Sequence, residues 1–286
     1  MSGVVQILDI KDDFFQTFKF KSGPTIGSGL SGNVVLATHL DNPNIKRAVK
    51  MFSSCNEEDA IKSKKLFVRE VKMMQSVDHP NILKAIVAVR CPMYLAICMP
   101  FYQKGSLSSL LHELTPSHLA VYFAQLTCVL SFLDHKRIVH ADIKPSNILV
   151  DDQQNVILGD FGLAFSVPQG TEVISSDKVG GTPAFMAPEL FTSGNVDPFK
   201  LDVYSLGATF WCILFQKEPK STLTFDYLFE INKSPDIPQP YRWALTKMLD
   251  PVLNKRLHIN LLLAKLREIR FCPTIIDHLT KADNSR

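Results

Sequence analysis

The sequence of 286 residues lacks most features that would assign it to a fibrous, secreted or repeat protein. It contains no internal repeat and no low-complexity segment. No two cysteines form a C-x-x-C pair, and most of them lie in apolar runs, so we expect buried free thiols in a reducing compartment. The six cysteines are Cys55, Cys91, Cys98, Cys128, Cys212 and Cys272.

Charge and hydrophobicity exclude further classes. The formal net charge is only +3 and both signs are mixed along the chain, so neither a nucleic-acid nor a membrane partner is indicated. The first residues show no basic start followed by an apolar run, and Ser2 stands where a myristoylated chain needs glycine. The most apolar stretch, near 204–215, is shorter than the roughly 20 residues that span a bilayer. We therefore expect an intracellular, cytoplasmic protein, and the sequence gives no indication of its oligomeric state.

The pattern of apolar residues predicts a sheet in the first part of the chain and helices in the second. Strands are expected within 18–36, where two flank a glycine-rich turn, and at 45–51, 84–90 and 93–99. A helix is expected over 58–77, with Phe67, Val71 and Met74 on one face. Glu70 lies beside that face, which is an unusual place for a carboxylate unless a cation meets it. Residues 101–106 form a linker, and further helices are expected from Pro116, over 202–216 and near 257–269.

A glycine-rich segment, G-S-G-L-S-G-N-V, occupies residues 27–34. Gly27, Gly29 and Gly32 allow the backbone to approach phosphate groups without a side-chain clash. Dinucleotide-binding folds use the same spacing, but a helix follows the glycines there, whereas the strand-like run V-V-L-A follows here. The segment therefore favours a phosphate-covering loop between two strands, with a plain hairpin turn as the alternative.

Two later segments supply charged and metal-binding groups. H-A-D-I-K-P-S-N occupies 140–147 and D-F-G occupies 160–162, with the strand-like run N-V-I-L-G between them. A carboxylate and an amide offer the oxygen ligands that suit Mg²⁺. Aspartate and asparagine in loops are often only turn formers, but two such loops on either side of one strand favour a metal site.

Two more short segments complete the set: R-A-V-K ends at Lys50, and A-P-E occupies 187–189. Together and in this order, these segments resemble the signature of the eukaryotic protein kinase family. D-I-K-P-S-N resembles the serine/threonine type of that family. The resemblance covers roughly residues 18–270. It implies an α+β, bilobal protein-kinase-like fold, with a small antiparallel sheet and one helix in an N-lobe of about 18–100 and a mainly helical C-lobe of about 106–270. Residues 1–17 would be an N-terminal extension and 271–286 a C-terminal tail.

The resemblance implies a serine/threonine protein kinase that transfers the γ-phosphate of ATP, bound with Mg²⁺ in a crevice between the lobes, to hydroxyls of a protein substrate. Asp142 would be the base, Lys144 would neutralise charge on the transferred phosphate, and Lys50, paired with Glu70, would bind the α- and β-phosphates. Asn147 and Asp160 would hold Mg²⁺. The residues expected to bind ATP are Ile26, Gly27, Gly29, Gly32, Val34, Ala48, Lys50, Met99, Pro100, Tyr102 and Leu149.

Three positions depart from the family pattern. Ala141 stands where the family carries the arginine that often receives an activation-segment phosphate, so we expect activity that does not depend on that contact. Ser31 replaces a frequent aromatic residue, which predicts looser cover of the phosphates. Pro100 replaces a frequent acidic residue but keeps the backbone carbonyl that adenine needs. Ala141, the G-G-T segment and the short length loosely resemble Mos-like kinases.

Other residues are expected to serve the fold. By resemblance, Glu189 would form a buried ion pair with Arg256, Asp202 would cap the backbone near His140, and His140 itself would be a packing residue. Ser175, Ser176 and Thr182 are open as phosphorylation sites.

Two alternatives compete with an active protein kinase. A pseudokinase would bind partners without chemistry, but Lys50, Asp142 and Asp160 are all present. A small-molecule kinase would share the H-x-D and metal motifs, but such enzymes typically lack the A-P-E segment and the helix start D-V-Y-S-L-G, which this chain has.

Overall fold

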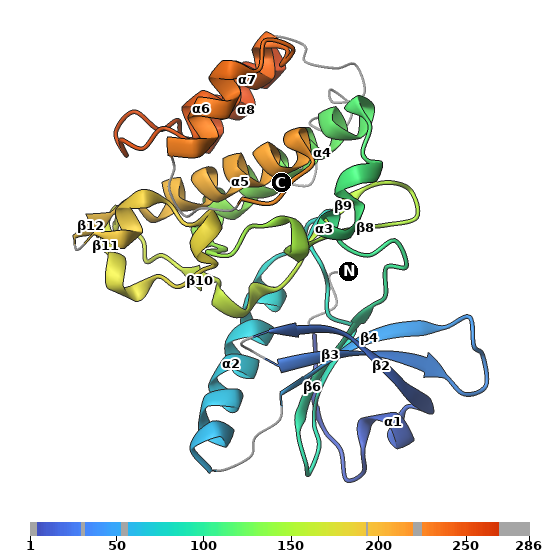
Figure 1. The fold of residues 1–286 in the computed structure, drawn as a ribbon. Helices are drawn as coiled ribbons and strands as arrows, with labels where there is room; N and C mark the ends of the chain where they lie inside the picture. The colour runs from blue at the N-terminus through green and yellow to red at the C-terminus, as the bar shows by residue number, and fades with distance from the viewer. Residues whose placement is uncertain (1–4, 30–31, 53–56, 193, 220–224, 269–286) are drawn as a thin grey trace. The chain divides into compact units, whose positions relative to one another are not determined.

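The computed structural model describes residues 5–29, 32–52, 57–192, 194–219 and 225–268, and the chain divides into two compact units (Figure 1). Unit 1 comprises residues 1–78 and 82–103, and unit 2 comprises 79–81 and 104–286. Four of the sequence predictions, those on Ser31, Cys55, Cys272 and the tail 271–286, lie outside the described residues.

Unit 1 is built on a six-stranded sheet in the order β1-β5-β6-β4-β3-β2. The strands are β1 (Ile7–Asp9), β2 (Phe20–Gly29), β3 (Gly32–His39), β4 (Lys46–Phe52), β5 (Val87–Arg90) and β6 (Leu95–Pro100). All neighbouring pairs are antiparallel except β1 and β5, which run parallel. The five strands expected from the sequence are thus confirmed, and β1 adds a short edge strand that the apolar pattern did not predict.

Helix α2 (Glu57–Ser76) packs against this sheet, close to the predicted bounds of 58–77. The three apolar residues predicted to share one face are buried, with Phe67 and Val71 fully inaccessible and Met74 5% exposed. The Phe67 ring meets the ring of Phe52 on β4 edge to face, at 5.6 Å between centroids. This apolar contact fixes which side of α2 faces the sheet and therefore where Glu70 points.

A second cluster in unit 1 forms around Phe14, the first residue of the short helix α1 (Phe14–Thr17). Phe14 is 1% exposed and packs with Val35, Val49 and Val89 from three strands. Asp13 caps α1 through the backbone N–H of Phe15 and also accepts a hydrogen bond of 2.6 Å from the Tyr94 hydroxyl. The residues just before the predicted domain start at 18 therefore contribute to the core of this sheet.

Unit 2 is mainly helical, as predicted. Its α-helices among the described residues are α3 (Leu107–Leu110), α4 (Pro116–His135), α5 (Pro198–Phe215), α6 (Phe225–Lys233), α7 (Gln239–Met248) and α8 (Ile259–Glu268). Thr115 and His118 form a capping box at the start of α4, with Pro116 at the first helical position. Among the described helices, α4 alone is long and apolar enough to cross a bilayer, but most of it is buried, as in the core helix of a globular domain.

Short pairs of antiparallel strands in unit 2 place the loops that carry the predicted chemistry. Strands β8 (Ile148–Val150) and β9 (Val156–Leu158) pair antiparallel, so the loop 140–147 precedes one strand and D-F-G follows the other. Strand β7 (Ile138–Val139) pairs with β10 (Phe165–Ser166), and β11 (Ile174–Ser175) pairs with β12 (Asn195–Val196). Together with the helical core, this arrangement confirms the protein-kinase-like α+β fold class.

The described cysteines Cys91, Cys98, Cys128 and Cys212 are free thiols, and all but Cys91 are buried. Burial raises the pKa of the Cys98 thiol to about 11 and that of Cys212 to about 12. These thiols therefore stay protonated and unreactive at neutral pH, in agreement with the sequence prediction.

Candidate active site

The predicted site residues divide between the two units. Unit 1 carries the glycine-rich hairpin, the Lys50–Glu70 pair and the expected adenine-binding segment, whereas unit 2 carries Leu149 and the loops of Asp142 and Asp160.

Lys50 and Glu70 form a buried ion pair in unit 1. Lys50 lies in the middle of the sheet, where β4 pairs with Val34 of β3 and Ile97 of β6. Its Nζ donates to both carboxylate oxygens of Glu70 at 2.8 Å, and the two residues are 5% and 1% exposed. A charge this deeply buried needs a close partner, and Lys50 therefore explains why α2 carries a carboxylate beside its apolar face.

The glycine-rich segment forms the end of the β2–β3 hairpin, where Gly27 pairs with Val34 and Gly29 with Gly32. Gly32 has φ +141°, and a Cβ there would lie 2.2 Å from the carbonyl oxygen of Met51, so only glycine fits. A Cβ at Gly29, in contrast, would meet no described atom within 4 Å. Packing therefore requires glycine at position 32 but not at position 29.

The other predicted nucleotide-binding residues lie on β2, β3, β4 and the end of β6, apart from Leu149. Ala48 and Met99 are register partners on β4 and β6 and are 8% and 6% exposed. Pro100 ends β6, Tyr102 follows it, and Ile26 on β2 is 43% exposed. Leu149 lies on β8 in unit 2, where it pairs with Ile157 and bridges to Ser106.

In unit 2 the carboxylate of Asp142 is held from both sides. Its Oδ1 accepts hydrogen bonds from the backbone N–H and the hydroxyl of Thr182, at 3.1 and 2.6 Å. Its Oδ2 accepts one from the Asn147 amide at 2.9 Å and lies 2.8 Å from Nζ of Lys144. Lys144 also donates to the Thr182 hydroxyl at 2.6 Å. The side chain of Asp142 is 8% exposed, so these four partners fix its orientation.

Thr182 was considered in the sequence only as a possible phosphorylation site. Its hydroxyl accepts from Lys144 and donates to Asp142, so it orients both predicted catalytic groups at once. No local pattern in the sequence indicates this hydrogen bond, because its two residues lie 40 positions apart.

Asn147 and Asp160 fit the chemistry of a magnesium site. The Asn147 amide nitrogen donates to the carbonyl and the carboxylate of Asp142, at 2.8 and 2.9 Å. Its amide oxygen accepts no hydrogen bond from the described residues, and it is the atom type that Mg²⁺ prefers. The Gly159 N–H donates to the Asn147 carbonyl at 2.8 Å, which ties the D-F-G loop to the loop of Asn147, and Asp160 follows with φ 57°.

His140 and Asp202 support this loop as predicted. Asp202 accepts hydrogen bonds from the backbone N–H groups of His140 and Ala141, at 2.6 and 2.9 Å. The His140 ring contacts the Gly159 carbonyl at 3.0 Å and packs edge to face on Phe161 at 4.8 Å. Burial raises the pKa of Asp202, while the two N–H donors favour its charged form.

Arg137 is a site residue that the sequence did not single out. Its guanidinium donates to three backbone carbonyls after the D-F-G segment, those of Val167 at 3.2 Å, Pro168 at 3.0 Å and Thr171 at 2.5 Å. It also stacks on the Phe199 ring at 5.1 Å. Ala141, between His140 and Asp142, is 8% exposed and adopts φ 65°.

The predicted structural pair of Glu189 and Arg256 is confirmed. Both guanidinium ends reach the carboxylate, at 2.6 and 2.8 Å, and the Arg256 side chain is fully buried. Arg256 also donates to the carbonyls of Asp250 and Lys200, each at 3.1 Å. This bidentate pair joins the A-P-E segment to the turn before α8.

Comparisons with known proteins agree with this geometry. Mitogen-activated protein kinase kinase kinase 2 of Arabidopsis thaliana is 32% identical over 209 residues, which cover 71% of this chain and 32% of that protein. CBL-interacting serine/threonine-protein kinase 24 of Arabidopsis thaliana is 29% identical over 254 residues, covering 84% and 55%. The calcium/calmodulin-dependent protein kinase kinase of Caenorhabditis elegans is 29% identical over 235 residues, covering 73% and 43%. This chain thus spans less than two thirds of each of these relatives. The family model of the protein kinase domain matches residues 20–265, and the chain therefore belongs to the protein kinase family.

Proposed function

We propose that this chain is a serine/threonine protein kinase that transfers the γ-phosphoryl group of ATP to hydroxyls of a protein substrate. The observation that carries the proposal is the fixed carboxylate of Asp142, held by Thr182, Lys144 and Asn147. Phosphoryl transfer depends mainly on positioning and on stabilising charge, and a carboxylate with one orientation suits a base that must meet an incoming hydroxyl.

The residues of unit 2 have separate roles in this proposal. Asp142 orients the substrate hydroxyl and accepts its proton as the bond from that oxygen to the γ-phosphorus forms and the bond from the γ-phosphorus to the departing ADP breaks. Lys144 neutralises charge on the transferred group, and Thr182 keeps both side chains in place. Asn147 and Asp160 would hold Mg²⁺, which supplies charge neutralisation on the phosphate oxygens when it is bound with ATP.

The residues of unit 1 bind the nucleotide in this proposal. Lys50 carries the charge that pairs with the α- and β-phosphates, and Glu70 holds it in place. The glycine-rich hairpin covers the phosphates, and the open space at Gly29 supports this role because packing does not require glycine there. Ile26, Val34 and Ala48 would contact the adenine ring beside Met99, while the carbonyl of Pro100 and the N–H of Tyr102 would bind its edge.

The catalytic assignment is tested with Lys50→Met and Asp142→Asn in the full chain, assayed with Mg-ATP and a randomised serine and threonine peptide library. Each variant should keep its fold by circular dichroism and lose phosphotransfer by at least about a hundredfold, since each removes several kcal/mol of stabilisation. Activity close to that of the unaltered chain in either variant removes the role of that residue. A well-folded chain that binds no Mg-ATP in a thermal-shift assay refutes the assignment as an enzyme.

We further propose that activity does not require a phosphate on the activation segment. Ala141 offers no guanidinium to receive one, whereas Arg137 binds the carbonyls of Val167, Pro168 and Thr171 with a charge that is always present. Two of the candidate hydroxyls are already engaged, because Ser176 is 4% exposed and donates to the Thr192 carbonyl and Thr182 donates to Asp142. Arg137 would thus anchor the segment in place of a phosphate contact.

Phosphatase treatment, followed by kinase assay, tests this second proposal. Full activity of the dephosphorylated chain is expected. Arg137→Ala should lower the activity and speed proteolytic cleavage within 163–186, while Arg137→Lys should recover only part, since an ammonium lacks the planar fork of donors. Loss of activity on dephosphorylation, restored by rephosphorylation within 163–186, would contradict the proposal, as would an Arg137→Ala variant with unchanged activity and cleavage.

A further inference from the structure

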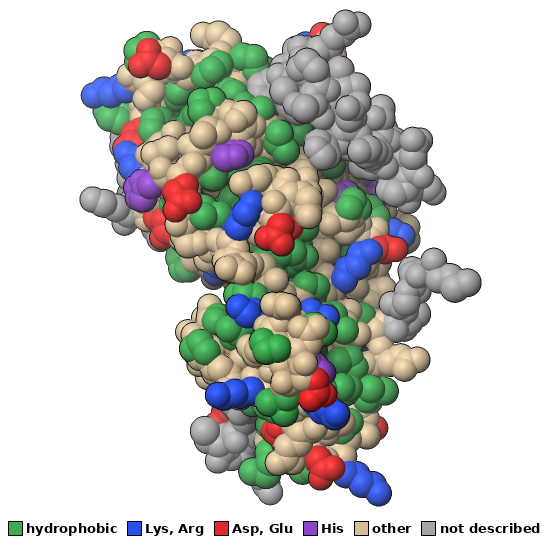
Figure 2. All heavy atoms as spheres, turned by 90° about the vertical axis from the view of Figure 1, so that its right-hand side faces the viewer, with side chains coloured by type: hydrophobic (Ala, Val, Ile, Leu, Met, Phe, Trp, Pro, Cys, Tyr) green, Lys and Arg blue, Asp and Glu red, His purple; other side chains and the backbone are tan. Residues whose placement is uncertain are grey.

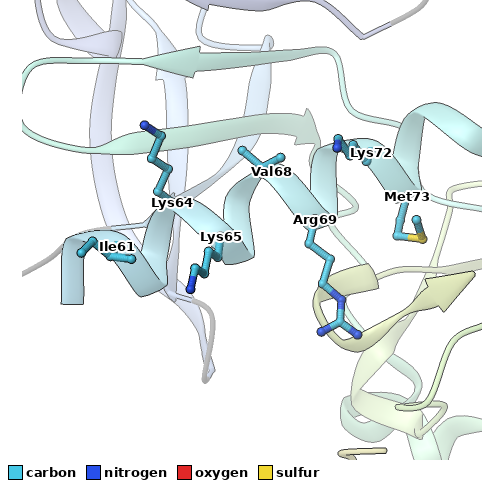
Figure 3. Close-up of a pocket in the computed structure, with 7 residues that line it drawn as sticks. All are labelled: Ile61, Lys64, Lys65, Val68, Arg69, Lys72 and Met73. Carbon is cyan, nitrogen blue, oxygen red and sulfur yellow. The ribbon is translucent and has the colours of Figure 1, made fainter. Parts of the chain in front are cut away.

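Two parallel rows of side chains on α2 line a hollow of about 620 Å³ on the surface of unit 1. Residues four apart stack along a helix, so Ile61, Lys65, Arg69 and Met73 form one row, and Lys64, Val68 and Lys72 form the other. Figure 3 shows these side chains on the two sides of the helix. A groove between two such rows is the shape into which a ridge of a second helix packs.

The rows combine apolar groups with cations. Ile61 is 59% exposed, and Val68 and Met73 are half-buried. Lys64, Lys65 and Lys72 are exposed, and none of them pairs with a carboxylate among the described residues. No acidic residue lines the hollow.

The acidic residues of α2 lie elsewhere. Glu58 and Asp59 are in its first turn, and Glu70 is buried against Lys50. By contrast, on the face seen in Figure 2, basic and acidic side chains lie scattered among one another. The hollow on α2 is therefore a local concentration of positive charge around apolar groups, in a chain whose net charge is only +3.

We propose that this groove of α2 binds an acidic amphipathic helix of a partner protein. The partner would place apolar side chains on Ile61, Val68 and Met73 and carboxylates near Lys64, Lys65 and Lys72. From Ile61 to Met73 the helix rises by 12 steps of about 1.5 Å, so the groove is about 18 Å long and matches roughly three turns of a bound helix. Nucleic acid fits less well, because it would leave the apolar groups uncovered, and the small net charge supplies no wider field to attract a polyanion.

The proposal does not depend on catalytic activity, because it concerns binding alone. The probe is a fluorescent peptide of roughly twelve residues with leucine at every third or fourth position and glutamate elsewhere, measured by anisotropy with the full chain. Binding should weaken at least tenfold with Lys65→Glu and with Lys72→Glu, and should persist with Lys72→Arg. It should also weaken at least tenfold when salt rises from about 0.05 to about 0.5 M, since the exposed charges are then screened.

The matched control is Lys62→Glu, which makes the same change of charge on an exposed residue of the same helix that does not line the hollow. It should change binding less than twofold. A loss with Lys62→Glu as large as that with Lys65→Glu would overturn the proposal, and so would no binding of the peptide to the unaltered chain. Equal binding of a glutamine-for-glutamate peptide, or of a peptide with its leucines spread around the helix, would overturn it too. If a DNA oligonucleotide or phosphatidylserine vesicles bind as tightly and lose binding with Lys65→Glu, the surface attracts polyanions in general and the proposal is wrong.

Discussion

Removing the charge of Glu189 should destabilise unit 2 far more than a surface substitution would. Glu189→Gln keeps the size of the side chain and one acceptor oxygen, but it leaves the guanidinium of Arg256 fully buried without a counter-charge. Breaking such a buried pair costs about 3–5 kcal/mol of unfolding free energy. At about 2–4 °C per kcal/mol for a domain of this size, the melting temperature should fall by about 6–20 °C.

The double variant Glu189→Gln with Arg256→Met distinguishes the charge from the packing. It buries no ion, and replacing both partners of a buried ion pair by uncharged side chains usually costs much less than removing one partner. The Asp250 and Lys200 carbonyls lose their guanidinium donors, at about 1–3 kcal/mol for each carbonyl that is left without another donor. We therefore expect the double variant to be more stable than Glu189→Gln alone, with a coupling free energy of about 2 kcal/mol or more.

Tryptophan fluorescence during urea or thermal unfolding measures the stability of unit 2. The sequence contains two tryptophans, Trp211 and Trp243, and both lie in unit 2. The control is Glu268→Gln, which breaks an exposed pair with Lys265 of 2.8 Å in the same unit and should change stability by less than about 1 kcal/mol. The reasoning fails if Glu189→Gln melts within about 2 °C of the unaltered chain, or if the two single substitutions simply add.

Three further results are expected. Thr182→Ala should lower kcat by about tenfold or more through lost positioning, whereas Thr182→Ser, which keeps the hydroxyl, should retain most of it; equal kcat for the two would show that the hydroxyl is not needed. Gly29→Ala should leave the melting temperature unchanged and raise KM for ATP, whereas Gly32→Ala should lower the melting temperature because its Cβ meets a carbonyl; the opposite pattern would contradict the roles given to the two glycines. The hydrogen bond to Asp134 raises the pKa of His258 above its usual 6.5, so the stability from this contact is complete below that pH and is lost as pH rises through the raised pKa. The difference in melting temperature between the unaltered chain and His258→Gln should therefore shrink from pH 6 to pH 8, and a constant difference would exclude this titration.

Much of the sheet unit could be predicted because its signals are local. Strand-like runs around the glycine motif predict the first strands of the sheet. The apolar spacing of Phe67, Val71 and Met74 predicts which face of α2 is buried. An isolated carboxylate on that face then predicted a buried cation partner, and the structure has Lys50 there. Patterns of this kind depend on a few residues at a fixed spacing, which the sequence records directly.

The features that were not predicted depend on contacts between distant segments. β1 has three residues and is placed by parallel pairing with β5, about 80 positions later, so its own sequence carries almost no strand signal. Arg137 follows the end of α4, where a cation is common, and its acceptors are carbonyls of residues 167–171, about 30 positions later. Thr182 belongs to the same class, since Asp142 lies 40 residues away.

The burial of Phe14 affects how this protein is truncated for experiments. Similarity to the family begins at residue 20, so a boundary drawn from it would delete an aromatic side chain that is 1% exposed among strands of the sheet. Loss of such a side chain costs about 3–5 kcal/mol, a large part of the free energy that holds a domain folded. A shortened chain starting at residue 20 would then show low nucleotide affinity because its sheet is unstable. An expression boundary before Ile7 keeps Phe14, so that a low affinity measured with it is a property of the intact sheet.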